Sequence, residues 1–182
     1  METEMPEVQS ASHHARSTVP RFSLGVAGLL IAVLGAWGGI VPFIGPTFGY
    51  SADGSGSWYW DLAHALLSLA PGAAALLVGL LIMAGAGTKL FHNALTGFAG
   101  FVAMLAGAWF VIGMVAWPVL YNSGVIAPAT PSTLLEEFAG YYGGVGCLLI
   151  ALGALLISYS EAAKKSNAPP AAAVASTPLG PQ

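Results

Sequence analysis

The stretch GFAGFVAMLAGAW, residues 97–109, repeats a pattern that the chain first shows in GVAGLLIAVLGAW, residues 25–37. A displacement of 72 positions superimposes the two and places Trp37 over Trp109. Matches of glycine and alanine are expected by chance in so small-residue-rich a chain, but tryptophan occurs only 5 times. The pattern therefore predicts that the chain is built from two related halves.

Composition indicates a membrane protein. Of the 182 residues, 56% are hydrophobic and only 7% are charged, whereas soluble domains average roughly 25% charged residues. So few charges do not cover a water-facing surface of this size, which favours a lipid-facing one. The net charge of -3 provides no basic surface for nucleic acid, so no nucleic-acid partner is expected.

Four apolar runs are long enough to cross a hydrocarbon core, which takes ~20 residues in a helix. None contains Asp, Glu, Lys or Arg, and they are continuous rather than alternating, which favours helices over a barrel. The predicted fold is all-α and integral to the membrane, with two tandem two-helix repeats forming a four-helix bundle. The predicted spans are 22–44, 62–84, 97–121 and 138–159.

The distribution of basic residues predicts the orientation. Every Lys and Arg precedes the first span, follows the fourth, or lies between the second and third. The other two loops, 45–61 and 122–137, contain only acidic charges. By the positive-inside rule both termini are cytoplasmic, which predicts a multi-pass protein of the plasma membrane. The ends, 1–21 and 160–182, are predicted to be disordered tails around a transmembrane domain at 22–159.

The repeat extends into the second helix of each half. Without a gap, the same displacement takes Gly72 to Gly144 and Asp61 to Thr133. Asp61 is predicted to cap the second span, and Thr133 with Glu136 has the form of a capping box. Two spans per half give both halves one topology, so they would be related by an axis along the membrane normal.

Small residues at a spacing of four predict close helix contacts in lipid. They occur as Gly35 with Gly39, Ala103 with Gly107, and Gly140 with Gly144. Whether such contacts lie within one chain or between chains stays open.

Two further apolar features are predicted to shape the bundle. Trp37 and Trp109 fall near mid-membrane and are candidates for core packing between the halves. Pro71 in the second span should free a backbone carbonyl and kink the helix.

The outer loop before the second span ends in a dense aromatic run that includes Trp58 and Trp60. Such residues are typical of the aromatic belt at the membrane surface, where Trp117 and Tyr141 are also expected. The alternative is an aromatic lip around a pocket for a lipid, a quinone or another small apolar molecule.

The polar candidates at the same rim are Asp61, His64, Glu136 and Glu137. Their types would suit a metal or proton site, although one histidine and scattered carboxylates make weak ligands. Capping and interface roles explain all four positions equally well.

No catalytic, cofactor or metal motif is present in the sequence. It contains no G-x-S-x-G, H-E-x-x-H, C-x-x-C or Walker pattern. The spans also contain no acidic or basic side chain, which weakens an ion-coupled transporter. A non-enzyme without cofactor or metal is therefore expected.

The segment AGAWFVIGMVAWP, residues 106–118, resembles small actinobacterial membrane proteins of the SPW-repeat type, which have tandem two-span repeats. The chain has Trp117-Pro118 in place of the family's Ser-Pro-Trp signature. The resemblance implies a plasma-membrane protein of a high-GC bacterium and brings no reaction with it.

Two functions fit these observations. The favoured one is an accessory, scaffold or assembly subunit that acts through helix–helix contacts with itself or another membrane protein in the lipid bilayer. The alternative is a binder or permeation pathway for a lipid or small apolar molecule, opening on the outer face.

Overall fold

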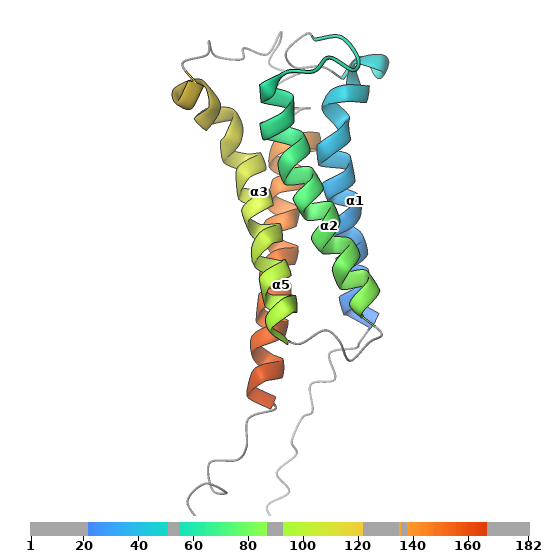
Figure 1. The fold of residues 1–182 in the computed structure, drawn as a ribbon, viewed down its shortest axis with the longest axis vertical. Coiled ribbons are helices and arrows are strands. Elements are labelled where there is room, and N and C mark those ends of the chain that lie inside the picture. The colour runs from blue at the N-terminus through green and yellow to red at the C-terminus, as the bar shows by residue number, and fades with distance from the viewer. Residues whose placement is uncertain (1–21, 51–54, 87–92, 122–134, 136–137, 167–182) are drawn as a thin grey trace, which may run out of the picture.

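The computed structural model describes residues 22–50, 55–86, 93–121, 135 and 138–166. Four long helices run roughly alongside one another in these ranges (Figure 1). Two of them begin with a wider π-helical turn. In chain order the elements are α1 (Phe22–Ile44), the 3-10 turn η1 (Gly45–Phe48), the π-turn η2 (His64–Leu69), α2 (Ala70–Gly85), α3 (Asn93–Tyr121), the π-turn η3 (Phe138–Tyr142) and α5 (Gly143–Ser166).

The predicted all-α class with four membrane-spanning helices is confirmed, because all four are long and apolar enough to cross a membrane. Their outer faces are apolar as well: Val33 is 56% exposed, Leu77 61% and Ile112 56%. A soluble protein rarely shows so extensive an apolar surface to water. The four apolar helices therefore fit a multi-pass membrane protein.

The fourth helix is longer than predicted, and the prediction that a disordered tail begins at residue 160 is wrong for 160–166. These residues are the last turns of α5. The segment contains good helix formers, and Glu161 pairs with Lys164 one turn later, at 2.6 Å. Lys164 and Lys165 also lie in the last turn, where the helix dipole favours positive charge. The remaining tail residues, 1–21 and 167–182, lie outside the described ranges.

Helices α1 and α2 form one closely packed hairpin. A Cβ added at Gly28 would lie 2.8 Å from the carbonyl oxygen of Gly79, and one added at Gly35 would lie 2.7 Å from that of Gly72. No side chain fits at these points, so the two backbones touch directly. This close approach provides the van der Waals contact that holds helices together in lipid.

Helices α3 and α5 form a second hairpin of the same kind. A Cβ at Gly100 or at Gly107 would lie 2.6 Å from the carbonyl oxygen of Gly153 or Gly146, respectively. The α3 glycines lie 72 positions after their counterparts in α1, whereas the α5 glycines lie 74 positions after their counterparts in α2. The structure thus differs from the ungapped sequence alignment, which pairs Gly72 with Gly144.

The two hairpins meet along α2 and α3 and, less extensively, along α1 and α5. The fully buried ring of Phe110 is seated on Gly38, where a Cβ would lie 2.6 Å from the ring's Cζ. The hydroxyl of Tyr141 donates to the carbonyl oxygen of Gly38 at 2.9 Å, and its ring packs edge-on against Phe110. These contacts form the centre of the joint between the hairpins.

Candidate functional site

The predicted polar pair, Asp61 and His64, does come together. The Asp61 Oδ1 atom accepts a hydrogen bond from the His64 backbone N–H at 2.7 Å, which confirms the predicted cap of the second span. The same oxygen lies 2.7 Å from the His64 Nδ1 atom. His64 is buried and its ring packs against Phe43 and Tyr59. One carboxylate oxygen therefore both caps the helix and orients the imidazole.

The other two polar candidates, Glu136 and Glu137, and the predicted cap at Thr133 lie outside the described residues. Among the residues that are described, no three His, Cys, Asp or Glu side chains gather as a metal site would require. At this rim of the bundle, Asp61 caps the second span, and Trp58 and Trp60 lie beside it; this region is called the aromatic end.

The aromatic candidates separate into two groups. Trp58 and Trp60 are 67% and 64% exposed at the aromatic end. Tyr141 and Trp117 were expected in the same belt, but both are buried, so that expectation is wrong for them. Tyr141 turns inward because its hydroxyl finds a backbone acceptor between the hairpins.

The glycines singled out by their spacing also differ in environment. Gly35 touches the backbone of α2, whereas a Cβ at Gly39 would meet nothing closer than 3.6 Å. Gly107 touches the backbone of α5. Gly140 is exposed, and Gly144 is crowded only by Ala139 of its own helix.

Two of the tryptophans within the spans, Trp37 and Trp109, connect the hairpins from the outside rather than from the core. Trp37 and Trp109 are 43% and 36% exposed. The Trp109 Nε1 atom donates to the carbonyl oxygen of Leu66 at 2.9 Å, and the Trp37 Nε1 atom donates to that of Gly140 at 3.2 Å. Each bond thus runs from the first helix of one hairpin to the second helix of the other.

Both acceptors lie in π-turns, and in one of them proline explains why the carbonyl is available. In η2 the Ala70 N–H bonds the carbonyl of Ala65, five residues earlier. In that register the next donor would be residue 71, which would bond Leu66. Pro71 has no N–H, so the Leu66 carbonyl loses its backbone partner and Trp109 replaces it.

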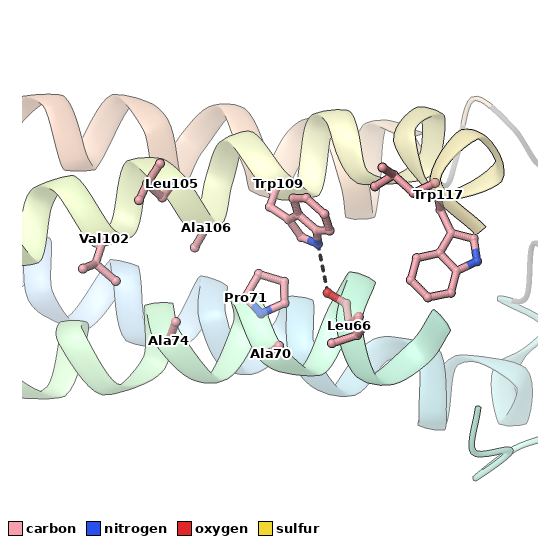
Figure 2. A pocket seen from close by; sticks show the side chains of 10 residues that line it. Leu66, Ala70, Pro71, Ala74, Val102, Leu105, Ala106, Trp109 and Trp117 are labelled. Atoms are coloured by element: carbon pink, nitrogen blue, oxygen red, sulfur yellow. Dashed lines mark hydrogen bonds between the residues drawn. The ribbon is translucent and has the colours of Figure 1, made fainter. Parts of the chain in front are cut away.

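An apolar groove of about 550 Å³ lies beside this bond, between α2 and α3. Figure 2 shows Pro71 and Ala74 of α2 facing Val102 and Ala106 of α3 across it, with the Trp109 indole over the proline. The last turns of α3, which contain Pro118, bend away from α2 (Figure 1). The remaining lining residues are Leu66, Ala70, Leu105, Trp117 and Leu120.

Sequence analysis did not predict this groove or the π-turns. Only Pro71 signalled a freed carbonyl, and nothing in the sequence identified its partner. The spacing of small residues located Gly35 and Gly107 but missed Gly146 and Gly153, because these two glycines stand seven positions apart rather than four.

The arrangement of the lining residues suits an apolar ligand. The groove is apolar along its length, and its lining residues contain no acid, base or nucleophile. No protein-family model matches the chain, and no curated protein or solved structure matches it.

Proposed function

We propose that this membrane protein binds the hydrocarbon chain of a membrane lipid in the groove between α2 and α3. The observation that carries the proposal is the groove itself, about 550 Å³ in volume and lined almost entirely by apolar side chains. Binding sites for small molecules commonly measure ≈ 300–1,000 Å³. The protein acts here as a non-enzymatic binder.

The position of the groove determines the kind of occupant. It runs from Val102 to Leu120 along α3, a distance of roughly 27 Å at 1.5 Å per residue. All of it lies within helices that are apolar enough to span a membrane. The surrounding medium at this depth is hydrocarbon, so a lipid chain is the ligand in greatest supply, and it needs no polar partner.

A comparison of the two hairpin contacts supports this face as the functional one. In the contact between α2 and α3, and again in the contact between α1 and α5, a tryptophan is bonded to a π-turn. Only η2 is followed by a proline, Pro71; the residue 74 positions later, after η3, is Val145. The groove lies where the two faces differ. If the two hairpins are copies of one unit, a binding site present in only one contact should show such a difference between matching residues.

The accessory or assembly function favoured by the sequence has less support. It was motivated by small-residue faces, but Gly35, which belongs to one of those faces, contacts Gly72 inside the chain. The close-packed glycines of the second hairpin do the same. An assembly role therefore stays a prediction that would need other surfaces.

We further propose that the protein lies in the plasma membrane with both termini in the cytoplasm. The support is the distribution of Lys and Arg in the sequence. A Ser166→Cys, Cys147→Ser variant tests it: an impermeant thiol reagent should label residue 166 only after the cells are opened. Labelling of intact cells would reverse the orientation.

We also propose that the hairpins are tandem copies, as in the SPW-repeat proteins that the chain resembles. Matching glycine contacts and matching tryptophan bonds support this, since Leu66 and Gly140 stand 74 positions apart like Gly72 and Gly146. Related sequences should then need a two-residue gap between residues 109 and 140 when their halves are aligned. An alignment that needs no gap would count against it.

Lipid binding is tested by filling the groove. Ala74→Phe places a ring inside it, whereas Ala73→Phe adds the same ring to the exposed neighbouring position. Lipid that stays bound after transfer into mild detergent is measured by native mass spectrometry. We expect Ala74→Phe to lose retained lipid and Ala73→Phe to keep it. Equal retention in both variants and the unmodified protein would refute the proposal.

A further inference from the structure

The segment between α1 and α2 holds Trp58 in an unusual backbone conformation. Its φ of 60° lies in the left-handed region, which is unfavourable for a residue with a Cβ. The Trp58 N–H donates to the carbonyl oxygen of Phe43 at 2.9 Å, and the Tyr59 N–H donates to that of Gly56 at 3.1 Å. The fold thus fixes this turn firmly despite its strain.

The rings are fixed as well. Phe43 is buried, with 5% exposure, and the Trp60 ring stacks on it with centroids 5.6 Å apart. Trp58 lies against the same ring at 6.3 Å. Both indoles are nevertheless about two-thirds exposed, at 67% and 64%. Their contacts order them without burying them, so most of each indole surface faces outward.

The depth of this pair follows from α1. Its 23 residues span roughly 35 Å at 1.5 Å per residue, against a hydrocarbon core of ≈ 30 Å. Phe43 is the second-last residue of α1, so the rings stacked on it lie near one boundary of that core. The end of α5 that carries Lys164 and Lys165 lies toward the other boundary.

We infer that Trp58 and Trp60 form a rigid anchor that binds the interface between lipid headgroups and hydrocarbon. An indole suits this layer because its ring is apolar and its N–H bonds water or lipid carbonyls. A bilayer is favoured over a protein partner because Leu62, two residues after Trp60 and at the start of the second span, is also exposed, at 55%. The inference does not depend on the groove.

The experiment uses the full chain in bilayers whose lipids carry bromine either near the headgroup or near the chain end. The emission lost in a Trp58→Phe/Trp60→Phe variant is that of the two indoles. We expect this component to be quenched more strongly by the shallow bromines than by the deep ones. Quenching by aqueous iodide with no effect of either bromine would overturn the anchor. So would protection from all three quenchers, which indicates a protein partner or a second copy.

A second measurement leaves both indoles in place. Ser57 is exposed beside Trp58 and accepts a nitroxide as Ser57→Cys in a Cys147→Ser background. We expect collisions with membrane-soluble oxygen and with an aqueous nickel chelate to be comparable, as they are at the boundary. Dominant collisions with nickel would place the segment in water and contradict the proposal.

Discussion

The indole of Trp109 donates a hydrogen bond to the carbonyl oxygen of Leu66, 2.9 Å away on the other hairpin. That carbonyl is available because Pro71 removes the N–H that would otherwise take it. A carbonyl that lacks its hydrogen bond within one helix is thus bonded by a side chain from another helix. This bond lies at the edge of the apolar groove.

Loss of the Trp109 donor should destabilise the joint between the hairpins. Trp109→Phe should lower the free energy of unfolding by about 1–2 kcal/mol, near the upper end for hydrogen bonds within membranes. Trp37→Phe is the matched control. It should cost about 0.5 kcal/mol, because the Trp37 bond is longer and Val145 can supply an N–H. Steric trapping in bicelles measures both values.

Pro71→Ala provides the corresponding double-mutant test. The alanine would restore an N–H for the Leu66 carbonyl, so Trp109→Phe should cost less in that background than in the unmodified protein. Equal costs in the two backgrounds would show that the proline does not explain the bond.

Gly35 and Gly39 should respond differently to alanine although both belong to one predicted motif. A Cβ at Gly35 meets backbone atoms of Gly72 and Ala75 within 3.0 Å, so Gly35→Ala should destabilise by about 1–3 kcal/mol. At Gly39 the nearest atom is 3.6 Å away, so the gain in helix propensity should leave stability unchanged or slightly higher. Thermal unfolding of both variants in detergent distinguishes them, and similar losses would contradict the direct contact between Gly35 and the α2 backbone.

The contact between the Phe110 ring and Gly38 should tolerate no added side-chain atom at residue 38. Gly38→Ala forces a methyl group against a fully buried ring, which should cost about 1–3 kcal/mol. Phe110→Leu in the same chain should recover part of that loss by making room. If the second change adds to the first instead, the two residues are not in contact.

The cap at Asp61 should be local in its effect. Asp61→Ala removes the acceptor for the His64 N–H and should cost about 1 kcal/mol, whereas Asp61→Asn should preserve most of the cap. Amide hydrogen exchange at His64 measures the change. Faster exchange in the Ala variant but not in the Asn variant is expected, and unchanged exchange in both would exclude the cap.

Hydropathy alone predicted the four spans well, since α1 begins and ends where the apolar run does. It failed at residues 160–166 because a helix can continue into polar sequence when ion pairs and basic residues in its last turn stabilise it. The site was harder to predict. Pro71 indicated that a carbonyl is freed in the second span. A π-turn adds a residue to one turn without any change in hydrophobic pattern, so neither the identity of that carbonyl nor the tryptophan that binds it could be predicted.

The same limit explains Tyr141. Its type and position are typical of a belt residue, but its direction depends on a turn whose geometry the sequence does not specify. Trp37 and Trp109 show the converse case: their place within the spans was predicted, whereas their partly exposed position at the edge of the joint was not.

The direct backbone contacts within each hairpin have a consequence for biogenesis. The close backbone contacts between α1 and α2 involve no residue of α3 or α5, so we expect this pair to insert and pack before α3 leaves the ribosome. Two separately translated pieces, divided within 87–92, should therefore each enter the membrane and reassemble into one particle.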